Sequence, residues 1–255
     1  MKKLLALLFV VLAVCSCAYA ETDLEYVKAK GTLVVGVTEF KPMDFKNEKG
    51  EWEGFDADLS RAFAESLGVK IEFQEIEWNN KILELDSKNI DCLWNGMTLT
   101  PEVEAAMLCS APYCNNAQVV VVPVSKAAEY STLEAIKGLS FAVEHGSTGD
   151  VEAQKHGFKA IQLQDQASAL MEVASGTADA AIIDLIMAAA MTGKGTGYEN
   201  LTHTLSLNGE VNVVGVRKGS DLGDALNEFF AKGYADGSIM KIAEKYGIQA
   251  AIITK

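Results

Sequence analysis

The chain has 255 residues, of which 49% are hydrophobic and 22% are charged, a balance that suits one large globular domain or two smaller lobes. Asp and Glu outnumber Lys and Arg by 35 to 22, which gives a formal charge of −13, and no basic block is present. Because such a charge repels phosphate backbones and anionic lipid headgroups, we expect no nucleic-acid partner and no electrostatic attachment to a membrane.

The N-terminus has the pattern of an export signal. Two lysines precede an unbroken apolar run over 4–14, which is too short to span a bilayer and has the length of a secretory signal core. We therefore interpret 1–20 as a signal peptide, with cleavage after Ala20. A loose lipobox that ends at Cys17 is the alternative, in which Cys17 carries a lipid anchor. Both alternatives place the protein in the periplasm or on the outer side of the cytoplasmic membrane.

From residue 33 onward, short apolar runs alternate with amphipathic stretches, which is typical of an α/β fold. Helical spacing of apolar residues starts near Leu59, with Asp56 as the expected N-cap of that helix. Further helices are expected around 82–85, 132–138, 170–173, 222–235 and 238–246. Strands are expected at 33–37, 71–76, 92–94, 119–122, 141–143, 160–163, 180–183 and 211–216.

The sequence carries few catalytic or metal-binding patterns. No HExxH, GxSxG or P-loop motif occurs, and the three histidines lack metal-ligand spacing. Beyond residue 20 the cysteines are Cys92, Cys109 and Cys114; a pairing of Cys109 with Cys114 stays open. No catalytic motif therefore indicates an enzyme, and we expect no metal and no cofactor.

Eight segments, taken in order, resemble the family-3 extracellular solute-binding proteins, the amino-acid receptors of ABC importers. The most specific is 49–59, KGEWEGFDADL, which is similar to the family signature GxxxGFDxDL. The other matching segments are 31–37, 77–79, 95–102, 110–113, 143–148, 175–184 and 216–219.

The resemblance implies a two-lobed periplasmic-binding-protein fold of type II, with a hinge and a ligand cleft between the lobes. The first lobe would contain 24–114 and, after the chain returns, 211–255, and the second lobe would contain 115–210. The implied partners are a small polar ligand, in the first place an amino acid, and an ABC transporter permease.

The resemblance also implies which residues bind the ligand. Asp184 matches the aspartate that binds the ammonium group, although it could instead cap the helix that follows. Polar groups of the first lobe would come from Asn95, Gly96 and Thr98, donors of the second lobe from Ser147 and Thr148 at a helix start, and aromatic walls from Phe40 and Trp78. Ordinary core packing is the alternative for both aromatic residues, and it is stronger for Phe40, because the turn that follows it departs from the family pattern YxPF.

One position departs from the family pattern. Val103 stands where the family has an arginine that clamps the ligand carboxylate, and a valine donates no hydrogen bond. Either Thr98, Thr148 and helix-end donors hold the carboxylate, or the ligand is a cationic amine without one. In the second case Glu39, Glu144 and Asp184 would form an acidic cleft, although Glu39 and Glu144 could also be solvated surface charges.

Two other functions are compatible with the same fold. Some relatives are exported dehydratases that act on cyclic dienyl acids, and a glutamate in the cleft could act as their acid. Others sense a ligand for a signalling partner. Both remain alternatives to the solute receptor.

Overall fold

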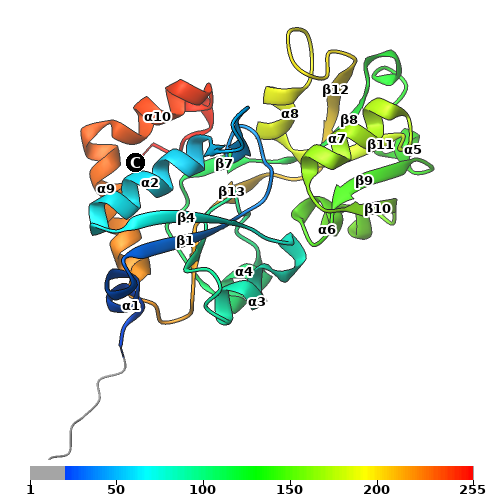
Figure 1. Ribbon diagram of the computed structural model, residues 1–255. Coiled ribbons are helices and arrows are strands. Elements are labelled where there is room, and N and C mark those ends of the chain that lie inside the picture. Colours follow the sequence, from blue (N-terminus) through cyan, green and yellow to red (C-terminus); the bar gives the residue numbers. More distant parts are fainter. Residues whose placement is uncertain (1–20, 255) are drawn as a thin grey trace, which may run out of the picture.

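The computed structural model describes residues 21–254, so the expected signal peptide and the lipidation site at Cys17 lie outside the described residues. Two α/β lobes lie side by side and are joined by two short crossing strands, β7 (Cys114–Asn116) and β13 (Glu210–Asn212), which pair antiparallel (Figure 1). This arrangement confirms the two-lobed fold that the sequence predicts.

The first lobe contains a five-stranded sheet with the order β4-β1-β5-β14-β6. Its parallel part is formed by β1 (Thr32–Val37), β4 (Lys70–Glu75) and β5 (Cys92–Leu93). The returning chain supplies β14 (Gly215–Val216), antiparallel to both β5 and β6 (Leu108–Cys109). A separate hairpin pairs β2 (Phe45–Lys46) with β3 (Trp52–Glu53). The sheet therefore joins residues from both ends of the described chain.

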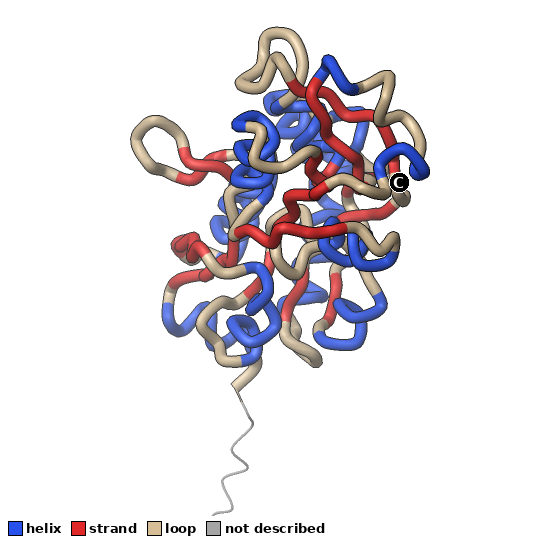
Figure 2. The backbone as a smooth tube through the Cα atoms, turned by 90° about the vertical axis from the view of Figure 1, so that its right-hand side faces the viewer, coloured by secondary structure: helices blue, strands red, loops and turns tan. Residues whose placement is uncertain are grey.

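Helices (blue) lie around the strands (red) in Figure 2. Those of the first lobe accompany this sheet. They are α1 (Asp23–Lys30), α2 (Phe55–Leu67), the 3₁₀ helix η1 (Trp78–Asn80), α3 (Lys81–Asp86), α4 (Pro101–Ala106), α9 (Leu222–Asp236), α10 (Ser238–Tyr246) and the 3₁₀ helix η3 (Gln249–Ala251). Aromatic residues fill the core between α2, α9 and the sheet: the Phe230 ring lies 5.5 Å from that of Trp94 and stacks at 5.4 Å on that of Tyr113. The C-terminal helices are thus part of the first lobe's core.

The second lobe has a sheet with the order β10-β9-β11-β8-β12. Its strands are β8 (Gln118–Pro123), β9 (Ser140–Glu144), β10 (Lys159–Leu163), β11 (Ala180–Asp184) and β12 (Leu201–Ser206), and β8 runs antiparallel to β11 and β12. The accompanying helices are η2 (Val124–Lys126), α5 (Leu133–Ile136), α6 (Thr148–Lys155), α7 (Gln166–Ser175) and α8 (Leu185–Met191). The parallel strands β9 and β11 both end toward the first lobe, at Glu144 and Asp184.

Two sequence expectations need correction. The run 211–216 is not one strand, because it divides into β13 in the crossing and β14 in the first sheet. Asp56 is not the N-cap of α2: the cap position is Gly54, whose φ of 135° brings its Cα so near the Met43 carbonyl that a Cβ would lie 2.1 Å from that oxygen. Asp56 lies fully buried in the first turn of α2 instead.

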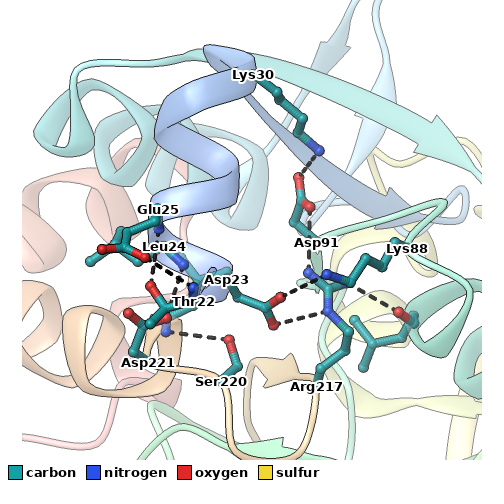
Figure 3. A network of polar contacts seen from close by, with 12 residues as sticks. Thr22, Asp23, Leu24, Glu25, Lys30, Lys88, Asp91, Arg217, Ser220 and Asp221 are labelled. Atoms are coloured by element: carbon teal, nitrogen blue, oxygen red, sulfur yellow. Dashed lines mark hydrogen bonds and ion pairs between the residues drawn. The ribbon is translucent and has the colours of Figure 1, made fainter. Parts of the chain in front are cut away.

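A buried network of charged side chains attaches α1 to the first lobe (Figure 3). Arg217, just after β14, donates to Asp23 at 2.9 Å and to the carbonyl oxygens of Leu85 and Ile90 at 3.1 and 2.7 Å. Its guanidinium also lies 3.6 Å from Asp91, a fully buried carboxylate that accepts from Lys30 at 2.7 Å. This network connects the N-terminal helix with the returning strand.

Candidate functional site

A cavity of about 210 Å³ lies between the two lobes and is lined by residues of both. The first lobe contributes the segment after β1, the start of η1 and α3, the turn after β5 and the start of α4. The second lobe contributes the ends of β9 and β11 and the starts of α6 and α7. The lining residues are Phe40, Trp78, Lys81, Asn95, Gly96, Met97, Thr98, Thr100, Pro101, Glu102, Val103, Glu144, Gly146, Ser147, Thr148, Val151, Gln166 and Asp184.

Nine of the ten residues expected to bind a ligand line this cavity; Glu39 is not among the lining residues. The Glu39 carboxylate accepts hydrogen bonds from the backbone N–H of Lys46 at 3.2 and 3.3 Å. Its side chain therefore caps the start of the β2–β3 hairpin. Phe40 and Trp78 line the cavity while being only 3% and 7% exposed, so they pack in the lobe as well as forming its wall.

Asn95 and Gly96 form a turn whose shape is fixed from behind the cavity. The Asn95 amide accepts from the Thr38 hydroxyl at 2.8 Å and donates to the Asp44 carboxylate at 2.9 Å. The Asp56 carboxylate accepts from the Gly96 N–H at 2.7 Å and from the Tyr113 hydroxyl at 2.8 Å. The buried aspartate of the GFDxDL segment thus positions the turn that lines the cavity.

Two carboxylates line the cavity, that of Asp184 at the end of β11 and that of Glu144 at the end of β9. Asp184 is 4% exposed, and its oxygens accept from the side-chain amides of Asn116 and Gln166. Asp184 occupies the N-cap position of α8, as the capping alternative expects, but its side chain makes no hydrogen bond to that helix. Glu144 is 3% exposed, and its Oε1 has no hydrogen-bond partner within residues 21–254.

Burial changes the acidity of this pair. Desolvation, followed by the charge of Glu210, raises the pKa of Asp184 to about 8. Desolvation, followed by the charge of Asp184, likewise raises the pKa of Glu144 to about 8. A cation placed between the two carboxylates would favour their ionised forms and satisfy the free Glu144 oxygen.

Ser147 and Thr148 lie where α6 begins, beside these carboxylates. Ser147 is the N-cap, and its hydroxyl oxygen accepts from the Asp150 N–H at 3.2 Å. The first N–H groups of a helix carry partial positive charge, so this end of the cavity favours a negatively charged group. The sequence-based placement of both residues at a helix start agrees with the structure.

Glu210, which the sequence analysis did not select, connects the cavity to the crossing strands. One of its oxygens accepts from Thr98 at 2.9 Å, Asn116 at 2.8 Å and Gln118 at 2.9 Å. Thr98 belongs to the first lobe, Gln118 to the second, and Asn116 to the crossing strand β7. No sequence motif marks this glutamate, because its role depends on contacts between distant segments.

The first-lobe wall contains the charged side chains of Lys81 and Glu102 and the uncharged side chain of Val103. Val103, the residue in the family's arginine position, lines the cavity and is 4% exposed. Lys81 was not selected from the sequence, although it follows Trp78 by three residues on the same turn. Among the lining residues it is the one with a cationic side chain.

The described segment shows neither a candidate metal cluster nor a disulfide. No group of three or more His, Cys, Asp or Glu residues between 21 and 254 has metal-binding geometry. Cys92, Cys109 and Cys114 are free thiols, so Cys109 and Cys114 are not paired in the structure. The helices within these same bounds include none that is long and apolar enough to cross a membrane.

Two lobes, a pair of crossing strands and a cavity between them with both apolar and polar lining residues define a two-lobed solute receptor. The profile of the bacterial extracellular solute-binding proteins, family 3, matches residues 33–249. The chain belongs to this family.

Named relatives have similar length and low identity. The chain is 26% identical to the L-cystine-binding protein TcyJ of Escherichia coli (strain K12), over 88% of the chain and 85% of that protein. It is 28% identical to the arginine-binding extracellular protein ArtP of Bacillus subtilis (strain 168), over 96% and 98%. A crystal structure of a mutant of ArgBP from T. maritima superposes with a TM-score of 0.82 at 31% identity, covering 88% of this chain and 98% of that one.

Most named relatives are binding proteins, but one is an enzyme. The cyclohexadienyl dehydratase of Pseudomonas aeruginosa is 29% identical over 69% of this chain and 68% of its own length. The family therefore defines the fold and the class of receptor, while the ligand of this chain depends on its own cavity.

Proposed function

We propose that this protein captures an amino acid in the cavity between its lobes and delivers it to an ABC importer. One observation carries the proposal: two buried carboxylates, Asp184 and Glu144, lie in the cavity together with hydrogen-bond donors at the start of α6. The two carboxylates suit the ammonium group of a ligand, and the N–H groups at the start of α6 suit its carboxylate. The cystine-binding and arginine-binding relatives support the same ligand class.

In the proposed complex, the ligand ammonium donates to Asp184 and to the unpartnered Oε1 of Glu144. The amides of Asn116 and Gln166 hold the Asp184 carboxylate in place. Its side chain therefore loses little conformational entropy when the ligand binds. Phe40 and Trp78 provide apolar surface for the ligand side chain. Thr98, Ser147 and Thr148 offer hydroxyl groups for its polar atoms.

A cationic amine without a carboxylate is the second candidate ligand, and Val103 favours it. With valine lining the cavity, no arginine at this position can bind a carboxylate. An amine would need only the acidic pair and the aromatic walls.

A dehydratase activity is the remaining alternative, and the raised pKa of Glu144, about 8, favours it because such a group holds a proton at neutral pH. We favour a receptor without catalysis, since most named relatives are binding proteins. Incubation with cyclohexadienyl carboxylic acids tests this alternative, because formation of an aromatic ring changes the ultraviolet spectrum. Turnover would overturn the non-enzymatic assignment.

We further propose that the protein acts outside the cytoplasmic membrane, as the family's description as extracellular implies. Mass spectrometry of the native membrane and soluble fractions distinguishes the two forms of attachment. A diacylglycerol on Cys17 would show a lipid anchor, whereas a chain that begins at Glu21 would show simple signal cleavage.

A thermal-shift screen tests the proposed ligand class. The panel contains amino acids, di- and polyamines, quaternary amines and short peptides. A ligand at a hundred times its dissociation constant adds about 2.7 kcal/mol of stability, which is several degrees for a chain of this size. We expect shifts with amino acids; shifts with amines alone would support the second ligand class and contradict the first.

A further inference from the structure

Lys81 is a buried cation in the wall of the cavity. It is the first residue of α3 and is 9% exposed. Its Nζ donates to the carbonyl oxygen of Gly146 at 3.0 Å and lies 3.4 Å from that of Trp78. Gly146 belongs to the second lobe, so the ammonium group lies where the two lobes meet.

The charge of Lys81 has no direct counter-ion in residues 21–254. Its two hydrogen-bond partners are neutral carbonyls, and it takes part in none of the ion pairs of the structure. Burial lowers the pKa of its ammonium group, and the charges of Glu102 and Glu144 offset this only in part. A lysine has three N–H donors, so one is left for another acceptor.

The position of Lys81 compensates for Val103. Both side chains line the same cavity as Ser147 and Thr148 at the start of α6, where the helix end also favours an anion. The Trp78 ring, whose centroid lies 5.2 Å from Nζ, covers the ammonium group on one side. A buried, unpaired cation beside a helix start is a site for an anionic group, and carboxylates are the anions that suit a cavity with ammonium-binding acids.

We propose that the Lys81 ammonium binds the carboxylate of the captured ligand in place of an arginine at position 103. The inference rests on the proposed receptor function and names the chemical feature that the receptor selects. The ligand is then an amino acid, with its ammonium at Asp184 and Glu144 and its carboxylate between Lys81 and the start of α6. A simple amine would leave Lys81 unpaired in the closed cavity.

Matched ligand pairs test the role of Lys81. Each pair is an amino acid and the amine formed by removing its carboxylate: arginine and agmatine, lysine and cadaverine, histidine and histamine. Isothermal titration with unmodified protein should show a preference for the amino acid of roughly 10- to 100-fold in the pair that binds, the range of one charge-assisted hydrogen bond. The substitutions Lys81→Met and Lys81→Gln should remove most of this preference, whereas Lys81→Arg should retain it.

The preference ratio separates ligand binding from a purely structural role. If Lys81 only held the lobes together through Gly146, its loss would weaken the amino acid and the amine equally and leave the ratio unchanged. An unchanged ratio in folded Lys81→Met or Lys81→Gln protein would overturn the inference while leaving the receptor function intact. The exposed ion-paired Lys137 of the second lobe supplies the control: Lys137→Met removes the same charge and should change neither affinity nor ratio.

Failure of the proposed function gives a different result. If amines bind as tightly as amino acids, or if no amino acid binds to unmodified protein, the amino-acid receptor itself is contradicted, and the inference about Lys81 falls with it.

Discussion

At the scale of single residues, the proposed recognition of the ligand depends on two carboxylates that are buried in the ligand-free structure. Asp184 and Glu144 end neighbouring parallel strands, where a sheet places side chains close together at one edge. Amides of Asn116 and Gln166 hold one of them, and the other keeps a free oxygen. This arrangement costs stability without a ligand and gives selectivity for a cationic group.

Asp184→Asn tests the ammonium site directly. The change keeps the shape and removes the charge, so an ammonium-bearing ligand should bind roughly 10- to 100-fold more weakly, as expected for one charged hydrogen bond. Titration calorimetry measures the difference. Asp179→Asn is the matched control, because Asp179 is also an aspartate of the second lobe that accepts hydrogen bonds, from Ser140, outside the cavity. Equal affinities of the Asp184 variant and the unmodified protein would remove Asp184 from the site.

The raised pKa values predict how stability depends on pH. The folded, ligand-free protein holds a proton on Asp184 up to about pH 8, whereas the unfolded chain loses that proton near the ordinary value of 3.8. Between these values the folded state binds more protons, so this group makes the free energy of unfolding fall as pH rises. Urea unfolding at pH 5 and pH 8 should show a smaller fall for Asp184→Asn than for unmodified protein. If the free energy of unfolding falls equally in the variant and in unmodified protein, the pKa of Asp184 is not raised in the folded state.

Some residue roles could be predicted from the sequence and others could not. The turn at Asn95 and Gly96, the helix start at Ser147 and the strand end at Asp184 follow motifs, so their places in the cavity were predictable. The predicted role of Asp56 as a helix cap was wrong. Its carboxylate instead accepts hydrogen bonds from Gly96 and Tyr113, which are distant in the sequence. Lys81 was missed because its burial depends on the approach of the second lobe.

At the scale of secondary-structure elements, the close approach of η1 to the turn before α6 closes one side of the cavity. Gly146 in that turn has a φ of 73°, and a Cβ there would lie 2.9 Å from the Cα of Asn79 in η1. The two elements belong to different lobes, so this contact exists only when the lobes are together.

Gly146→Ala should therefore impair closure. The added methyl group would clash with the backbone of η1 when the lobes come together. We therefore expect Gly146→Ala to lower the ligand affinity, beyond any loss of stability of the ligand-free protein. Gly157→Ala is the control, because Gly157 also has a positive φ, 68°, in the second lobe but has nothing within 4 Å of a new Cβ. Both variants carry the left-handed strain of about 1–2 kcal/mol. If titration shows equal affinities for the two variants, the contact between η1 and the turn has no part in binding.

The attachment of α1 gives a second prediction about elements. Arg217 is 8% exposed and joins Asp23 of α1 to the buried Asp91. Arg217→Met therefore removes the buried ion-pair partner of both carboxylates and leaves them only Lys88 and Lys30. Breaking such a buried network should cost about 3–5 kcal/mol in the free energy of unfolding. Lys88 also lies by Asp23, at 3.6 Å, but is half exposed, so Lys88→Met should cost less than about 1 kcal/mol. Similar losses in urea unfolding would show that burial does not decide the strength of this network.

The boundaries of elements were predicted where one apolar run forms one strand. The run 180–183 became β11, but 211–216 divided into β13 and β14 because the chain leaves the crossing there and enters the first sheet. Short paired strands such as β7 are set by their partners rather than by their own residues, so local patterns did not reveal them.

At the scale of the whole molecule, the chain crosses between lobes only through β7 and β13 in the described region, and the cavity lies next to that crossing. Glu210 accepts from Thr98 of one lobe and Gln118 of the other, which connects the cavity walls with the crossing itself. The first lobe is built from both ends of the described chain, so relative movement of the lobes needs changes only near these strands.

Calorimetric titration tests the proposal that this cavity binds an amino acid. The protein is purified after export, unfolded in denaturant to remove any bound ligand, refolded, and titrated with each amino acid. If the proposal holds, at least one amino acid binds saturably at one molecule per chain, and it binds roughly 10- to 100-fold more weakly to Asp184→Asn. Correctly refolded protein that binds no amino acid would contradict it.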